Sequence, residues 1–316
     1  MTRIVHFAAV LLLILTRVSA VAGQPSSVLR IGIMPIADTL PLYVAIDHGH
    51  LAAEGIEVRL MPLWSGARII EALAGGSLDL GLSATLSILQ AAEQGLDLVI
   101  VQASSFVRTD AIPVSALMVL KDSGITSAPD LRGKIIGVNS LKSIAYLVTA
   151  EYLARGGVRP GQVTWHEVGF PQMPAALEQR RVHAVLVAEP FLTVLKDTDR
   201  ARILSPAQEV MAGHSMSAYT ALRSWHAANA RVMEAFDRGY KKGVEDCIKN
   251  SDKARDILAR NTNTPAGLAQ KIGLHLYSRG VVPAELAGLQ ELAQRHRLLT
   301  KGVDINRILA PTAVLR

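Results

Sequence analysis

One pattern of segments occurs twice along the chain, about a hundred residues apart, and this repeat constrains the fold more than any single motif. Each copy opens with a branched run around a glycine, continues with a helical segment, and closes with an apolar run after an Ala-Leu pair. Gly55 and Gly157 stand where a left-handed residue would end the helix of each copy. The matching segments are 31–33 and 136–138, 51–56 and 153–158, and 72–82 and 176–186. Two copies are too few for a solenoid, so we predict two similar lobes.

Short apolar runs alternate with segments of helical periodicity along most of the chain. The runs predict strands at residues 29–34, 56–60, 78–82, 98–103, 116–120, 135–138, 163–168 and 184–188. Alternation of strands and helices is typical of an α/β fold, and we expect mostly parallel sheets.

Two crossings between the lobes are expected. An apolar strand flanked by turn residues, at 113–124, leads from the first lobe to the second, and the chain returns around 203–219. We therefore predict lobe 1 from residues 28–114 plus 206–316 and lobe 2 from residues 115–205, joined by a hinge of two crossings. After about Trp225 the periodicity becomes helical, with breaks near Pro265 and Pro283, which predicts a helical layer packed on lobe 1. Cys247 lies in this helical pattern and is expected to be buried.

Residues 1–23 have the features of a secretory signal peptide. Arg3 supplies a positive charge, residues 4–15 are apolar, and small residues precede cleavage sites after Ala20 or Gly23. An apolar run of about a dozen residues is too short to span a bilayer core of about 30 Å, and Arg17 interrupts it. We expect the protein to be exported to the periplasm, without a lipid anchor because no cysteine follows the apolar run.

Composition narrows the function classes. The chain has 33 Lys+Arg and 27 Asp+Glu, but the basic residues are scattered and not interleaved with aromatics, so no nucleic-acid partner is expected. The single cysteine excludes an intramolecular disulfide and a cysteine-rich metal site. Gly-x-Ser-x-Gly, the phosphate loop and His-Glu-x-x-His are all absent from the sequence, which favours a binding protein over an enzyme, with no cofactor.

His48 and His50 are the closest pair of histidines. Their spacing of two residues would place them on different faces of a helix, so we expect two surface histidines and no metal site.

In α/β sheets, ligands bind at the carboxyl ends of the strands, where loops lead into the next helices. These loops are rich in hydroxyls. Each hydroxyl at a helix start has two interpretations: it caps its own helix, or it belongs to a cleft into which several helix N-termini point their N–H groups. Lys142 either adds a positive charge to this cleft or is solvated. The loop hydroxyls considered are Ser65, Ser83, Thr85, Ser105, Ser140 and Ser143, and Asn139 stands beside them.

Two aromatic and two acidic residues also fall at strand ends. Trp64 and Phe191 are either ligand-facing or simply core. Asp38 either caps the helix that begins near Leu40 or accepts hydrogen bonds from an amine, hydroxyl or ring N–H of a ligand. Glu189 has the same ligand-facing interpretation, and its alternative is an ion pair at the boundary between the lobes.

Several blocks of the chain resemble the solute-binding proteins of ABC importers in the nitrate, sulfonate and taurine group, also called NMT1/THI5-like. The blocks are Pro-Leu-Tyr-Val-Ala at 41–45, Gly-His-Leu at 49–51, Glu-Gly-Ile-Glu-Val at 54–58, Ser-Gly at 65–66, Ala-Leu-Ala-Gly-Gly-Ser-Leu-Asp-Leu-Gly at 72–81, Ser-Gly-Ile at 123–125, Asp-Leu-Arg-Gly-Lys-Ile-Ile-Gly-Val at 130–138 and Glu-Pro-Phe at 189–191. Together they cover roughly residues 29–195.

The resemblance implies a two-lobed periplasmic-binding-protein fold of type II that closes on a ligand and docks, as a monomer, on an ABC permease with its ATPase. The ligand is then a small organic anion or a polar heterocycle, such as a sulfonate, nitrate, an aromatic acid or a pyrimidine.

Asn139-Ser140-Leu141 lacks the glycine-serine step that sulfonate binders often show. Pyrimidine-synthesising enzymes of this fold use a cysteine-rich motif that this chain cannot contain. An enzyme of the same fold, or a ligand sensor for a signalling partner, is the alternative. The resemblance carries over Asp38, Ser65, Ser83, Thr85, Asn139, Ser140 and Glu189 as pocket residues.

Overall fold

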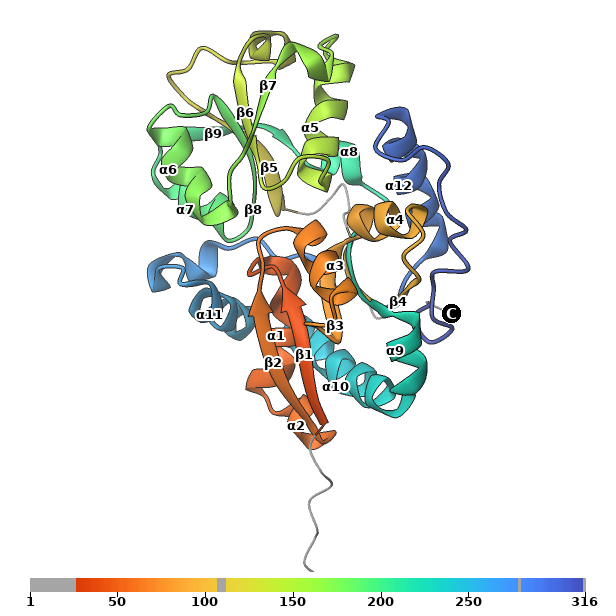
Figure 1. The fold of residues 1–316 in the computed structure, drawn as a ribbon. Coiled ribbons are helices and arrows are strands. Elements are labelled where there is room, and N and C mark those ends of the chain that lie inside the picture. The colour runs from red at the N-terminus through yellow and green to blue at the C-terminus, as the bar shows by residue number, and fades with distance from the viewer. Residues whose placement is uncertain (1–26, 107–111, 278–279, 315–316) are drawn as a thin grey trace, which may run out of the picture.

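The computed structural model describes residues 27–106, 112–277 and 280–314. The predicted signal peptide, residues 1–23, lies outside these ranges. The described strands form two separate sheets, and helices pack around each (Figure 1). We call the body around the six-stranded sheet lobe 1 and the body around the five-stranded sheet lobe 2. In Figure 1, the yellow and green middle of the chain forms lobe 2, whereas the orange and blue ends share lobe 1.

The sheet of lobe 1 combines strands from both ends of the sequence, in the order β11-β4-β10-β3-β1-β2. These strands are β1 (Ser27–Ile33), β2 (Ile56–Pro62), β3 (Leu80–Ala84), β4 (Leu98–Phe106), β10 (Ser215–Leu222) and β11 (Leu276–Tyr277). β1 pairs in parallel with β2 and β3, whereas β10 pairs antiparallel with both β3 and β4.

The sheet of lobe 2 has the order β7-β6-β8-β5-β9. Its strands are β5 (Ser115–Leu120), β6 (Ile135–Val138), β7 (Thr164–Glu167), β8 (Ala184–Ala188) and β9 (Ala201–Pro206). β6 pairs in parallel with β7 and β8, whereas β5 pairs antiparallel with β8 and β9.

All eight predicted strands are present, with ends shifted by up to three residues. The prediction of mostly parallel sheets holds for strand direction, since β1–β4 in lobe 1 and β6–β9 in lobe 2 each run the same way, but it did not include antiparallel pairs. In each sheet one strand is inserted between two neighbours that run the other way: β10 in lobe 1 and β5 in lobe 2. Both strands are the first that the chain forms after it changes lobes. Such a strand is not preceded by a crossover helix within its own sheet, which is the connection that parallel pairing requires. The short β11 also pairs antiparallel, with β4.

Helices cover both sheets. They are α1 (Leu40–Asp47), α2 (His50–Ala53), α3 (Gly66–Ala74), α4 (Thr85–Glu93), α5 (Ile144–Arg155), α6 (Met173–Glu178), α7 (Phe191–Asp197), α8 (Gln208–Met211), α9 (Arg223–Ala228), α10 (Ala230–Lys249), α11 (Ser251–Thr262) and α12 (Pro283–Arg295). Short 3-10 turns are η1 (Ala37–Thr39), η2 (Ala128–Leu131), η3 (Pro160–Gln162), η4 (Phe170–Gln172) and η5 (Ala266–Lys271). No helix within the described ranges is both long and apolar enough to cross a membrane.

The helical tail packs on lobe 1 as predicted: α10 lies along α1, and α12 contacts α4 (Figure 1). Cys247 on α10 is buried, and burial raises the pKa of its thiol to about 12, so it is an inert core side chain. Ile248, the next residue of the same apolar pattern, is exposed. The two repeated glycines, Gly55 and Gly157, have the predicted left-handed backbone, with φ of +75° and +72°.

The prediction for His48 and His50 is wrong in its geometry. α1 ends at Asp47, Gly49 adopts a left-handed φ of +71°, and α2 begins at His50. The helical spacing rule therefore does not apply, and both imidazoles reach the same side chain, Asp246 on α10.

Candidate functional site

A cavity of about 60 Å³ lies between the two lobes. Since one water molecule needs about 10–15 Å³ of such space, the cavity admits only a small ligand in this arrangement of the lobes. Lobe 1 lines it with Met34, Ile36, Asp38, Gly66, Ala84, Ser87, Met216, Ser217 and His275, and lobe 2 with Ser115, Asn139, Ser143, Ile144, Ala145, Phe170, Leu186 and Ala188.

The cavity lies where the sequence predicted a binding site, at the carboxyl ends of strands and the starts of helices. Leu186 and Ala188 come from the end of β8, and Ile36 follows β1. Gly66 and Ile144 are the first residues of α3 and α5, and Ala84 precedes α4. The positive ends of three helix dipoles therefore lie at the wall of the cavity.

Asp38 is the buried carboxylate of the cavity. Its Oδ1 accepts hydrogen bonds from the hydroxyls of Ser105 at 2.5 Å and Ser217 at 2.6 Å, and its Oδ2 lies 3.0 Å from His275 Nε2. Burial alone would raise the pKa of Asp38, but the charge of His275 and the hydrogen bonds from these three side chains outweigh it and hold the pKa well below its usual range. Asp38 does not cap α1, which has no side-chain cap. A carboxylate has about four acceptor positions, so Oδ2 can accept one more donor.

Two other buried polar atoms that line the cavity lack a hydrogen-bond partner within the described protein. They are Ser115 Oγ, on the first residue of β5, and His275 Nδ1, in the segment that leads into β11. His275 Nε2 donates to the ionised Asp38, and its Nδ1 is an acceptor in the neutral imidazole and a donor in the imidazolium. Buried polar groups nearly always have partners, so a molecule bound in the cavity is the natural partner of both atoms.

Glu189 joins the lobes and does not line the cavity. Its carboxylate accepts hydrogen bonds from Thr193 N at 3.0 Å, from Thr193 Oγ1 at 2.8 Å and from Gly273 N at 3.1 Å. Its backbone oxygen accepts from Ala37 N at 2.9 Å. Burial raises the pKa of Glu189, although the N–H groups of Thr193 and Gly273 act in the opposite direction. These hydrogen bonds replace the ion pair considered from the sequence.

Trp64 and Phe191 meet across the lobes. Their rings pack edge to face with centroids 6.1 Å apart; Trp64 is 36% exposed and Phe191 9%. Asn139, which lines the cavity, donates its side-chain N–H to Trp64 O at 3.2 Å. The two aromatic side chains thus mark a contact between the lobes but do not line the cavity itself.

Helix capping explains only one of the predicted hydroxyls. Ser143 caps α5 by accepting from Tyr146 N at 3.3 Å. Ser83 and Thr85 do not cap α4, because this helix begins at Thr85 itself. The buried hydroxyl of Ser83 donates to Gly66 O, and that of Thr85 donates to Ser215 O. Ser140 donates to Leu141 O at 3.3 Å and caps no helix.

The remaining predicted residues lie close to the cavity without lining it. Ser65 precedes α3, and its side chain makes no capping hydrogen bond. Ser105 acts on the cavity through Asp38 and Ser217, with which its hydroxyl forms hydrogen bonds. The side chain of Lys142 is exposed, and its backbone oxygen accepts from Gln90 Nε2 at 3.1 Å. The structure therefore places Asp38, Asn139 and Ser143 in the cavity wall and the other predicted residues around it.

Sequence reasoning missed four polar residues of the cavity: Ser87, Ser115, Ser217 and His275. Ser217 lies on β10, which was not predicted, although Ser-Met-Ser-Ala-Tyr-Thr-Ala-Leu contains the alternation of a strand. His275 lies in the tail, which carries no recognisable motif. Ser115 was assigned to a crossing strand rather than to the site.

A family model described as NMT1/THI5 like matches residues 36–254 of the chain. The chain is 25% identical over 223 residues to a formylaminopyrimidine-binding protein of Halalkalibacterium halodurans. The aligned region covers 70% of this chain and 66% of that relative, which is just under two thirds of its length. It is 24% identical over 323 residues to a putative aliphatic sulfonates-binding protein of Escherichia coli, with 99% and 98% of the two chains covered. A shorter match, 26% identical, covers 44% of the chain and 38% of a 4-amino-5-hydroxymethyl-2-methylpyrimidine phosphate synthase of Schizosaccharomyces pombe.

The fold is shared with solved binding proteins. The alkanesulfonate-binding protein of Xanthomonas axonopodis pv. citri, bound to MOPS, superposes with a TM-score of 0.74 at 21% identity, covering 93% of this chain and 100% of that one. The predicted two-lobed periplasmic-binding-protein fold is therefore confirmed.

Proposed function

Because the chain belongs to the NMT1/THI5-like family, we propose that it is the substrate-binding component of an ABC import system. The lobes close around a small ligand, and the closed protein delivers it to a membrane permease and its ATPase. The observation that carries this proposal is the cavity between the lobes, with one unpartnered polar atom from each lobe, Ser115 Oγ and His275 Nδ1. A ligand that bonds to both atoms needs the closed arrangement, so binding shifts the population toward it.

The ligand is a small polar heterocycle that carries an N–H or amino group. Asp38 Oδ2 offers an acceptor to such a donor, a ring nitrogen or N–H of the heterocycle can meet the unpartnered His275 Nδ1, and Phe170 and Leu186 give the cavity apolar walls. Among the described residues that line the cavity, none is a lysine or an arginine. The name of the formylaminopyrimidine-binding relative is in keeping with this ligand class.

A small organic anion is the second candidate ligand. The starts of α3, α4 and α5 at the cavity wall favour negative charge. The ionised Asp38 opposes it, so an anion fits best when its charge lies at the helix starts and an amine or N–H faces Asp38.

Binding without catalysis is the proposed activity. The enzymatic alternative, a pyrimidine synthase of the same fold, rests on a partial match, and the cysteine-rich motif implied for such enzymes is absent from a chain whose single cysteine is Cys247. A sensor that uses the same cavity for a signalling partner is the other alternative.

We place the mature protein in the periplasm as a monomer, exported by residues 1–23. Lobe 1 comprises residues 28–114 plus 206–316, and lobe 2 residues 115–205. The strand content supports these boundaries: apart from the end residues Ser27 and Pro206, each sheet draws its strands from one of the two sets.

The test is a thermal-shift screen of the purified protein against pyrimidines, sulfonates, nitrate, carboxylates and riboflavin, followed by calorimetric titration of each hit. The proposal expects saturable one-to-one binding, a raised melting temperature, and ligand recovered unchanged by mass spectrometry. Turnover of a hit would establish the enzymatic alternative. If no compound raises the melting temperature, these ligand classes are wrong for this cavity.

A further inference from the structure

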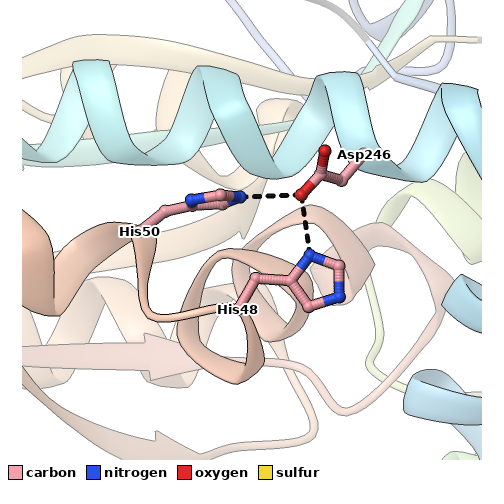
Figure 2. A group of neighbouring side chains, drawn as sticks. All are labelled: His48, His50 and Asp246. Atoms are coloured by element: carbon pink, nitrogen blue, oxygen red, sulfur yellow. Dashed lines mark hydrogen bonds and ion pairs between the residues drawn. The ribbon is translucent and has the colours of Figure 1, made fainter.

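Three side chains that are far apart in the sequence converge on one face of lobe 1, away from the cavity. Figure 2 shows that His48, from the end of α1, and His50, at the start of α2, both point at Asp246 on α10. His48 Nδ1 and His50 Nε2 each lie 2.7 Å from the same oxygen, Asp246 Oδ2. The possible ligand atoms of the three residues all lie within 4.8 Å of one another.

We propose that His48, His50 and Asp246 form a binding site for Zn²⁺ or a similar divalent ion of the first transition row. Two imidazole nitrogens and one carboxylate oxygen are a ligand set that these ions favour over Ca²⁺ or Mg²⁺, which prefer oxygen ligands. Three protein ligands leave one tetrahedral position for water. This site is independent of the proposed transport function.

The two contacts to Asp246 need only a small adjustment to hold an ion. In a tetrahedral site with metal–ligand distances of about 2.0–2.2 Å, neighbouring ligand atoms are about 3.3–3.5 Å apart. Each histidine nitrogen must therefore move roughly 0.6–0.8 Å farther from Asp246 Oδ2 than the 2.7 Å observed. The two rings are nearly perpendicular, at 80°, with centroids 5.8 Å apart, so they approach one ion without contacting each other face to face.

The side chains are exposed enough for an ion to enter. His48 is 36% exposed at its side chain, Asp246 28% and His50 24%. Partial exposure also keeps the cost of removing water from the ion low.

Close packing holds the three backbones in place. Gly243 lies one turn before Asp246 on α10, and a Cβ there would come within 2.4 Å of Pro41 O and 2.8 Å of the Ala45 Cβ. The missing side chain lets α10 approach α1 closely enough for Asp246 to reach His48.

Ion pairs on either side fix the register of the helices. Glu54, which follows α2, binds Arg238 at 2.9 Å and Lys242 at 3.3 Å on α10, and Asp47, next to His48, binds Arg260 at 3.0 Å on α11. The basic groups closest in sequence to Asp246, Lys249 and Lys242, are paired with the carboxylates of Glu245 and Glu54. The scaffold is ordered by contacts other than the three ligands, which lowers the entropic cost of binding.

The ion would link the α1–α2 turn to the C-terminal helical layer. Asp38 and His48 lie near opposite ends of α1, an eight-residue helix about 12 Å long. A bound ion therefore acts as a staple between sequence-distant elements of lobe 1, and it does not contact a ligand in the cavity.

The experiment is a calorimetric titration of the full chain, without a polyhistidine tag and after treatment with EDTA, with ZnCl₂. We expect one Zn²⁺ per chain and a higher melting temperature in its presence. Asp246→Asn keeps the size of the side chain and its capacity to accept hydrogen bonds, so this variant should fold. It should bind zinc at least about tenfold more weakly, since even the substitution of residues outside the ligand set lowers metal affinity by about 10–100-fold. The double variant His48→Gln/His50→Gln should lose the site.

His166→Gln is the matched control, because His166 is an exposed histidine of lobe 2 outside the cluster. It should bind zinc like the wild type. Co²⁺ provides a second readout, since its visible absorption intensifies when the hydrated ion becomes tetrahedral. Zinc binding that is equal in the wild type and in both site variants, or absent from the wild type, overturns the proposal and leaves a hydrogen-bonded cluster only.

Discussion

Replacing Ser115 by alanine should stabilise the free protein and weaken ligand binding at the same time. The Ser115 side chain is buried, 5% of the residue is exposed, and its hydroxyl has no partner within the described protein. An unpaired buried hydroxyl costs about 1–3 kcal/mol, so its removal should raise the free energy of unfolding by about 1 kcal/mol, or leave it unchanged where water enters the cavity. A ligand that bonds to this hydroxyl should lose about 0.5–1.5 kcal/mol of binding free energy, which is roughly a two- to twelvefold increase in Kd.

Urea unfolding of the free protein measures the first effect without any ligand, and calorimetry with a ligand from the screen measures the second. Ser205→Ala is the matched control. Ser205 is equally buried on the neighbouring strand β9, but its hydroxyl donates to Glu209 Oε2 at 3.1 Å and does not line the cavity. It should lose about 1 kcal/mol of stability and bind ligand normally. A loss of 1 kcal/mol or more in Ser115→Ala, with unchanged affinity, would refute the reasoning and assign Ser115 a purely structural role.

Three further substitutions test the site. Asp38→Asn breaks the buried pair with His275 and should lower the free energy of unfolding in urea by up to about 3–5 kcal/mol. The control Asp122→Asn breaks an exposed pair with Arg180 and should lower it by about 0–1 kcal/mol. Equal losses in the two variants would contradict the assignment of Asp38 and His275 as a buried, stabilising pair. Gly66→Ala places a Cβ 2.7 Å from Ser83 Oγ and 3.0 Å from Ala84 N, so it should lower the free energy of unfolding by about 1–3 kcal/mol. In the control Gly161→Ala, the new Cβ meets no atom within 4 Å, and the free energy of unfolding should change by less than about 0.5 kcal/mol in the same assay. Burial raises the pKa of Glu189, so its stabilising contribution is complete below the unfolded pKa of about 4.3 and is lost as the pH rises through the folded pKa. The stability of the wild type minus that of Glu189→Gln should therefore fall as the pH rises above about 4.3. A difference independent of pH would show that the Glu189 pKa is not raised.

Local patterns predicted the repeated half of each lobe well. The branched runs around Gly32 and Gly137 form β1 and β6, and the left-handed glycines, Gly55 and Gly157, end the helical segments as expected. These features depend on neighbours in the sequence: side-chain periodicity, and a backbone conformation that glycine adopts without strain. The helical tail was equally accessible, because Pro265 and Pro283 mark its breaks.

Contacts between distant segments could not be read from the sequence. Ser83 and Thr85 have the chemistry of N-caps, but their hydroxyls find Gly66 O and Ser215 O instead, because α3 and β10 lie against this helix start. His48 and His50 show the same limit, since only the packing of α10 brings Asp246 between them. In each case a tertiary acceptor or donor outweighs the local preference of the side chain.

The antiparallel direction of β5 and β10, which the sequence did not predict, and the missed cavity residues Ser115 and Ser217 have one cause. β5 and β10 are the strands that the chain forms immediately after it crosses between the lobes, and they are inserted against the direction of their neighbours. Because the crossings lie where the lobes meet, these strands begin beside the cavity and bring Ser115 and Ser217 into its wall. A rule that looks for ligand-binding residues only at the carboxyl ends of parallel strands finds Asp38 and Asn139 and misses these two. In a two-lobed fold, the first residues of the strands that follow each crossing should be examined as candidate ligand contacts together with the ordinary loops.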